Sequence, residues 1–124
     1  MVLVFSGTNA PDITKGPFPR VRFEGEVVRS VESGPIIAHH EGQSWIVDGE
    51  RYSRCDCAKA AWVHFERVDG SRSKTYGPLD HLSFQDGVAF VNRQVFAFVD
   101  RGAVDWYCHD DGRHWPLMIV EPAR

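Results

Sequence analysis

Four Asp-Gly dipeptides separate short runs of β-branched and aromatic residues along this sequence. Asp and Gly tolerate the positive φ angles of tight hairpin turns, so each dipeptide predicts a reversal between two antiparallel strands. The repeated alternation of run and turn predicts a meander. The four turns are Asp48-Gly49, Asp69-Gly70, Asp86-Gly87 and Asp111-Gly112, and Ser33-Gly34 and Arg101-Gly102 are weaker versions of the same signal.

Strands are expected in the runs between these turns. Val21, Phe23 and Val27 alternate with charged residues from Arg20 onward, the period of a half-buried strand, and Gly25 predicts a bulge or a close backbone approach. The later strands are expected at 35–40, 44–47, 61–68, 88–92, 94–99, 104–108 and 115–120.

The length of 124 residues fits a single domain, residues 1–124, with one core. The fold class is therefore all-β: a single-domain antiparallel meander that forms either a small barrel or a two-sheet sandwich. Segment 7–19 holds three prolines and two glycines and is expected to be irregular, covering the domain surface. At most one short helical turn is expected, at 55–61, where three alanines and a lysine favour a helix.

Charge and hydropathy narrow the function classes. A net charge of −3 provides no positive field for nucleic acid, and no run approaches the roughly 20 apolar residues of a membrane span. The basic residues Lys15, Arg20, Arg22 and Arg29 are interleaved with glutamates, as on a solvated strand face. An apolar start cut off by Ser6 and an odd number of cysteines, three, indicate a cytoplasmic protein, although one disulfide plus a free thiol stays open.

The cysteines and two histidines raise the possibility of zinc. Zinc takes four thiolate or imidazole ligands, and residues two apart on a strand share a face, so Cys55 and Cys57 could reach one ion together. The alternative is that the cysteines are small core residues, since free Cys is among the most buried residue types. No cofactor is expected in that case. The candidate metal ligands are Cys55, Cys57, Cys108, His109 and His114.

Catalytic motifs are absent from the sequence: we find no nucleophile elbow, phosphate-binding glycine loop or His-Glu-x-x-His signature. Asp80-His81 and His109-Asp110-Asp111 place carboxylates beside imidazoles, which could orient a base. Adjacent residues on a strand point to opposite faces, however, and so these side chains need not touch. No catalytic residue is assigned.

The stretch 106–115 is the best candidate for a binding surface. It concentrates aromatic, imidazole and charged groups around a predicted hairpin, and Trp, Tyr and Arg often dominate interface energies. The alternative is a core-filling hairpin with a polar tip. The candidate binding residues are Trp106, Tyr107, His109, Arg113, His114 and Trp115.

Residues 62–91 resemble one blade of a bacterial β-propeller repeat. The resemblance rests on Trp62 to Gly70, which ends in Asp-Gly, then Tyr76-Gly77, and then the run from Leu82 to Val91 with its Ser-Phe-Gln-Asp-Gly turn. It covers about a quarter of the chain, supports the hairpin interpretation of its turns and carries over no catalytic residues. A chain this short cannot close a propeller of four or more blades.

Three function hypotheses follow. The first is a non-enzymatic binding module that acts through a protein–protein surface, on another protein or on a second copy of itself. The second is a zinc-binding protein that uses the Cys and His cluster. The third is a metal-free enzyme with a His-centred site. Nucleic acid and membrane are not expected as partners.

Overall fold

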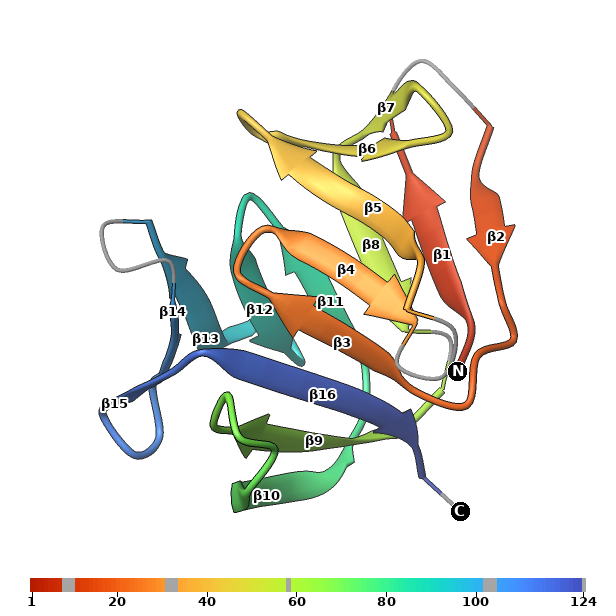
Figure 1. The fold of residues 1–124 in the computed structure, drawn as a ribbon. Helices are drawn as coiled ribbons and strands as arrows, with labels where there is room; N and C mark the ends of the chain where they lie inside the picture. The colour runs from red at the N-terminus through yellow and green to blue at the C-terminus, as the bar shows by residue number, and fades with distance from the viewer. Residues whose placement is uncertain (8–10, 31–33, 58, 102–104, 124) are drawn as a thin grey trace.

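A computed structural model describes residues 1–7, 11–30, 34–57, 59–101 and 105–123, without the side chains of residues 72 and 73. Its strands form two antiparallel eight-stranded sheets, and no helix occurs among the described residues. Neither sheet closes on itself in this part of the chain. The all-β prediction is confirmed, and of its two architectures the fold is sandwich-like rather than a closed barrel (Figure 1).

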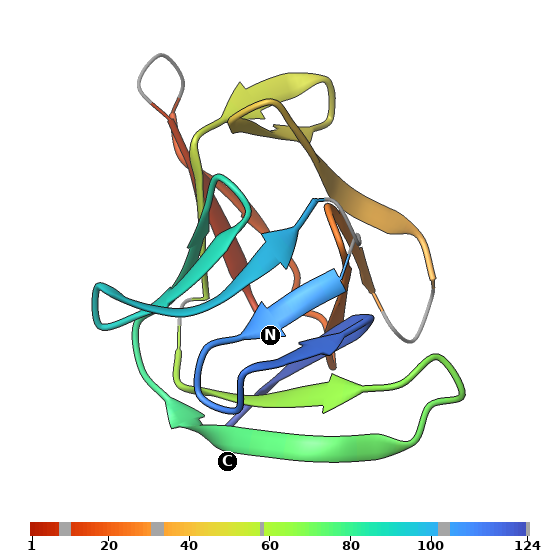
Figure 2. The same ribbon diagram turned by 90° about the vertical axis from the view of Figure 1, so that its left-hand side faces the viewer.

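The first sheet, called sheet A here, has the strand order β15-β14-β13-β12-β11-β8-β1-β2. Five of its strands, β11 to β15, follow one another as the predicted meander, and Figure 2 turns this part of the molecule toward the viewer. The strands of sheet A are β1 (Leu3–Ser6), β2 (Ile13–Lys15), β8 (Arg54–Cys57), β11 (Leu82–Gln85), β12 (Val88–Val91), β13 (Gln94–Asp100), β14 (Asp105–Cys108) and β15 (Arg113–Trp115).

The second sheet, sheet B, has the strand order β10-β9-β16-β3-β4-β5-β6-β7 and contains a second meander from β3 to β7. The C-terminal strand β16 lies between β9 and β3, which joins two distant parts of the sequence. The strands of sheet B are β3 (Val21–Glu24), β4 (Val27–Ser30), β5 (Ile36–Glu41), β6 (Ser44–Val47), β7 (Glu50–Tyr52), β9 (Ala61–Glu66), β10 (Arg72–Leu79) and β16 (Leu117–Pro122).

Aromatic side chains from both sheets meet in the core between them. Phe23 of β3 stacks on Phe84 of β11 with ring centroids 4.3 Å apart, and Trp106 of β14 packs edge-on against both rings. The indole of Trp45 on β6 donates a hydrogen bond of 3.3 Å to the carbonyl of Phe84, again from one sheet to the other. Burial of large aromatic surfaces on both inner faces stabilises the sandwich.

The predicted turns are confirmed wherever both of their residues are described. Asp48-Gly49 joins β6 to β7 and Asp86-Gly87 joins β11 to β12, and all four of these residues have positive φ. Asp69-Gly70 and Asp111-Gly112 lie in the β9–β10 and β14–β15 connections. Ser33 and Gly102 lie outside the described residues.

Three local predictions differ from the structure. Segment 55–61 is not helical where described: residues 55–57 belong to β8, which pairs with β1 on one side and β11 on the other, and Ala61 begins β9, so sheet pairing overrides the local helix propensity. Segment 7–19 includes a strand, β2, which pairs with the buried N-terminal strand β1. Gly25 is no bulge, because it lies with φ 56° in the hairpin turn between β3 and β4.

The run 115–120 is not one strand either. β15 ends at Trp115 in sheet A and β16 begins at Leu117 in sheet B, with Pro116 between them. Proline has no backbone N–H and cannot donate to a sheet ladder, so this residue suits the point where the chain leaves one sheet for the other.

Candidate functional site

The outward face of sheet A carries a row of side chains in direct cross-strand register. Val88 lies opposite Phe98, Phe98 opposite Tyr107, and Tyr107 opposite His114. Directly opposed residues of antiparallel strands share a face, so the row crosses from β12 to β15. The ring centroids of Phe98 and Tyr107 are 5.0 Å apart and those of Tyr107 and His114 are 5.1 Å apart. We call Phe98, Tyr107 and His114 the ring stripe.

The ring stripe is held at the surface because the alternate residues of the same strands fill the core. Ala97, Trp106 and Cys108 are buried, whereas Phe98 and Tyr107 are half-buried and His114 is exposed. His114 Nε2 lies 3.0 Å from Asp100 Oδ2, which fixes the imidazole at the outer end of the row. The arrangement offers a continuous row of rings as a contact surface.

Alternation along the strands therefore sends the side chains of the predicted binding hairpin to both faces of the sheet. Trp106 and Trp115 are only 1% and 4% exposed and belong to the core, and the Trp115 indole donates to Asp111 Oδ2 at 3.1 Å. The other four candidates, Tyr107, His109, Arg113 and His114, are half-buried or exposed. A partner can contact these four side chains, and the core interpretation holds for the two tryptophans.

The five candidate zinc ligands do not meet at one point. Cys55 and Cys57 lie on β8, whereas Cys108 lies on β14, four strand positions away in sheet A and therefore about 19 Å along the sheet. No group of three or more His, Cys, Asp or Glu side chains suited to hold a metal occurs among the described residues. The zinc hypothesis rested on spacing in the sequence, whereas the strand order of sheet A separates these residues.

All three cysteines are free and buried. Burial raises the pKa of the Cys57 thiol to about 12, and it also raises the pKa values of Cys55 and Cys108. Burial thus favours the neutral thiol over the thiolate at all three cysteines. The structure contains no disulfide.

The buried His64 contacts a carboxylate of another strand, whereas His39 lies 3.6 Å from Glu41 of its own strand. His64 on β9 is 3% exposed, its Nε2 lies 2.7 Å from Glu121 Oε1 on β16, and its Nδ1 lies 2.9 Å from Thr75 Oγ1 on β10. This hydroxyl–imidazole–carboxylate row was not predicted, because its members are up to 57 positions apart in the sequence. Neither of the two cavities described below is lined by these residues, and the row bridges three strands.

A second buried histidine faces a carboxylate without a hydrogen bond to it, since His40 Nδ1 lies 3.9 Å from Glu26 Oε1. The imidazole of His40 packs edge-on against Trp45 at 5.0 Å, and neither of its nitrogens makes a hydrogen bond. Desolvation lowers the pKa of His40, against an opposing contribution from Glu26. Arg101 lies near it and bonds Glu26 at 2.9 Å and Asp86 at 3.0 Å, which ties turns of the two sheets together.

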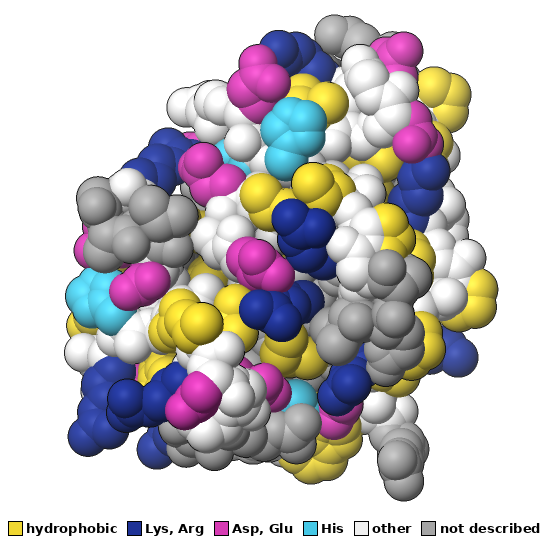
Figure 3. Space-filling model, viewed as in Figure 1, with side chains coloured by type: hydrophobic (Ala, Val, Ile, Leu, Met, Phe, Trp, Pro, Cys, Tyr) yellow, Lys and Arg dark blue, Asp and Glu magenta, His cyan; other side chains and the backbone are white. Residues whose placement is uncertain are grey.

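The basic residues singled out in the sequence are paired with acidic residues. Arg22 Nε lies 2.7 Å from Glu24 Oε1, Arg29 Nε lies 3.7 Å from the same oxygen, and Lys15 pairs with Asp48. Figure 3 shows positive and negative side chains interspersed on this side of the molecule. In the matching view of Figure 1, strands β3, β4 and β16 face the viewer on this side. The interpretation as a solvated strand face with mixed charge agrees with this pairing.

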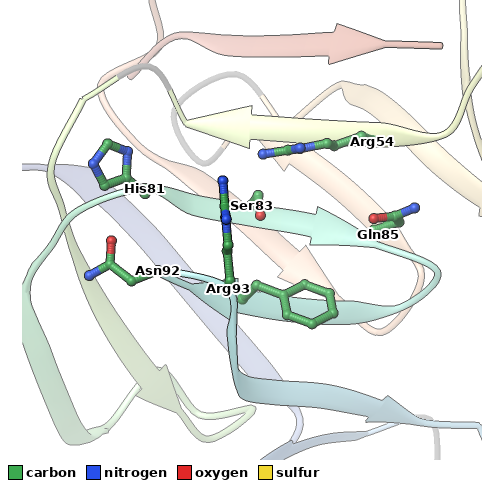
Figure 4. Close-up of a pocket in the computed structure, with 7 residues that line it drawn as sticks. Arg54, His81, Ser83, Gln85, Asn92 and Arg93 are labelled. Carbon is green, nitrogen blue, oxygen red and sulfur yellow. The ribbon is translucent and has the colours of Figure 1, made fainter. Parts of the chain in front are cut away.

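A cavity of about 570 Å³ opens on the outward face of sheet A beside the ring stripe. Its side chains come from β8, β11, β12 and the flanking turns, and Figure 4 shows Arg54 and Arg93 extending over Ser83 from two sides, with His81 and Asn92 at one end and Gln85 at the other. Sequence reasoning missed this site. The residues that line it are Arg54, His81, Ser83, Gln85, Phe90, Asn92 and Arg93.

A second cavity of about 470 Å³ lies where β10 approaches the β12–β14 strands. It is lined by His109, one of the predicted binding residues, together with Tyr76 and Phe96, whose rings are 5.4 Å apart. The Cys108 thiol reaches the Tyr76 hydroxyl at 3.7 Å behind it. This cavity continues the predicted binding region onto the neighbouring strands.

The predicted blade region 62–91 contains two hairpins, β9–β10 and β11–β12, which lie in different sheets. Within the part of the chain that the structure describes, no helix is long and apolar enough to cross a membrane. Comparison of the chain with protein-family models, with curated proteins and with solved structures yields no match.

Proposed function

We propose that this protein is a non-enzymatic binding module that contacts a partner protein through the outward face of sheet A. The observation that carries the proposal is the ring stripe: Phe98, Tyr107 and His114 stand in register on three adjacent strands and keep part of their ring surface open to solvent. Aromatic residues are enriched at protein interfaces because they bury a large area with few rotatable bonds.

The surroundings of the ring stripe support a protein partner. β15 is the last strand of sheet A and has only three residues, so a short edge lies beside the rings, where an extended segment of a partner could pair. The net charge of −3 disfavours nucleic acid. Three free cysteines agree with a reducing compartment, and we place the module in the cytoplasm.

A site-specific crosslinking experiment tests the proposal. A photoreactive p-benzoylphenylalanine replaces Phe98 in one variant and, as the matched control, Ile36 in another, since Ile36 is 56% exposed on sheet B. We expect a discrete adduct of defined mass from position 98 in cells and none from position 36. Adding Tyr107→Ala should remove the adduct, because an interface anchor contributes about 2 kcal/mol.

The outcomes separate the hypotheses. An adduct with a different protein supports the proposal, and an adduct of two copies of this chain converts it to self-association. Equal labelling from both positions, or an adduct that Tyr107→Ala leaves unchanged, contradicts the proposal. A thermal unfolding midpoint close to that of the unmodified protein shows that each variant is folded.

A further inference from the structure

The polar side chains of the 570 Å³ cavity have few partners within the protein. His81, Gln85, Asn92 and Arg93 make no side-chain hydrogen bond or ion pair with any described residue, and Arg54 engages Asp56 through Nε alone, at 2.9 Å. The terminal guanidinium nitrogens of both arginines are therefore free to donate. Unpartnered donors gathered in a concave site are typical of a binding pocket.

The charges that line the cavity have one sign. Arg54 and Arg93 extend toward the same space, and no aspartate or glutamate is among the lining residues (Figure 4). Arg54 already pairs with Asp56 at 2.9 Å, so Arg93 is the arginine of this cavity without a counterion among the described residues, and an anion bound between the two guanidinium groups would neutralise it. The positive cavity stands out on a chain whose net charge is −3.

The backbone that presents these side chains is unusual. His81, Asn92 and Arg93 have φ angles of 55°, 50° and 68°, and they are three of the five non-glycine residues with positive φ in the described chain. Asn tolerates positive φ, whereas this conformation is sterically unfavourable for a long side chain such as Arg. Such conformations cluster at ligand sites, where the fold holds a side chain in a required direction.

We propose that this cavity is an oxyanion-binding site, in which Arg54 and Arg93 grip a phosphate or carboxylate group between them. Planar guanidinium groups donate two parallel hydrogen bonds to such oxygens. Ser83, Asn92 and His81 supply further donors at the rim, and the Phe90 ring offers an apolar wall to the body of the ligand. The site does not depend on the ring stripe, because the two share no residue.

Two sources can present this oxyanion: a free small anion, or an acidic side chain of a protein partner. We propose to follow backbone amide resonances by NMR during titration with sodium phosphate and, separately, with a glutamate-containing peptide, both against sodium chloride at equal ionic strength. We expect saturable shifts at residues 54, 81, 92 and 93. The probe that binds more tightly identifies the source.

Two arginine variants provide the decisive comparison. Arg93→Gln should weaken anion binding by roughly tenfold or more, because it removes a charge-assisted hydrogen bond. Arg67→Gln, an exposed arginine in the β9–β10 connection of sheet B, is the matched control and should bind as the wild type does. Arg93→Gly should lose binding with an unfolding midpoint at or above that of the wild type, since glycine adopts positive φ without strain.

The proposal is overturned if neither probe gives saturable shifts at the cavity, or if Arg93→Gln and Arg67→Gln reduce binding equally. An Arg93→Gly variant that unfolds would show that Arg93 is structural, and this too would contradict the assignment. The crosslinking result at position 98 is scored separately, so failure of the partner surface and failure of the anion site are distinguishable.

Discussion

Polar side chains on the outward face of sheet B contact one another, whereas several of those at the cavity of sheet A have no partner among the described residues. On sheet B the charged and imidazole groups contact one another: His64 contacts Thr75 and Glu121, and Arg22 pairs with Glu24. On sheet A, His81 and Arg93 border a cavity and have no partner among the described residues. Hydrogen-bonded polar groups on a strand face stabilise the sheet, whereas unpartnered groups in a concavity are available to a ligand. This contrast agrees with the proposal that the outward face of sheet A contacts a partner.

The largest expected effect is a difference in the free energy of unfolding between substitutions on the inner and the outward face of sheet A. Trp106→Ala should lower the free energy of unfolding by about 3–5 kcal/mol, because it empties a core position that is 1% exposed. The neighbouring Tyr107→Ala should cost far less, since that ring is half-buried on the outward face. Urea unfolding of both variants provides the measurement. Equal losses would show that the ring stripe is structural and would remove the contrast between the two outward faces.

The second prediction makes the same substitution on both outward faces. His64→Asn should lower the free energy of unfolding by about 1–3 kcal/mol, because it breaks the hydrogen bonds to Thr75 and Glu121 made by a ring that is 3% exposed. His81→Asn should stay within about 0.5 kcal/mol, since His81 is exposed and asparagine tolerates its positive φ. Chemical denaturation at pH 7 compares the two. A larger loss at position 81 would indicate that the polar groups at the cavity, rather than the His64 row, stabilise the fold.

A smaller effect concerns pH and the buried His40. Its folded-state pKa is lowered below the ordinary 6.5 by desolvation, so below pH 6.5 the unfolded chain binds a proton that the folded chain excludes. Stability should therefore fall as the pH decreases from 6.5 toward the folded pKa. Unfolding free energies at pH 7.5 and 5.5 should differ less in His40→Leu than in the wild type. An identical pH dependence in both proteins would exclude His40 as its source.

Local sequence signals predicted the Asp-Gly turns, because a tight reversal depends on the φ preferences of only two residues, whereas the short strands β2, β7 and β8 were not predicted. The Asp48-Gly49 and Asp86-Gly87 turns have the positive φ that this chemistry predicts. The predicted strands 88–92 and 94–99 break at Asn92-Arg93, but no turn was assigned there, since Arg is not a typical turn residue; its φ is 68°. That turn lies at the cavity, where the local preference of the chain and its tertiary structure disagree.

The candidate site was only partly predictable for a related reason. Sequence marked 106–115 as rich in binding chemistry, but alternation along β14 sends Trp106 inward and Tyr107 outward, and the pairing register decides which face is which. The cavity residues come from positions 54 to 93, and no sequence pattern links them. Sheet order brings β8 next to β11 and places Arg54 near Ser83.

The sequence by itself determined that this chain is an all-β domain whose turns lie at its Asp-Gly dipeptides, because strand alternation and turn chemistry act over a few neighbouring residues. Tertiary structure alone decided that the strands divide into two sheets, that Pro116 lies where the chain passes from one to the other, and that two arginines border one cavity. Those outcomes depend on contacts between residues far apart in the chain, whose free energies no local pattern encodes.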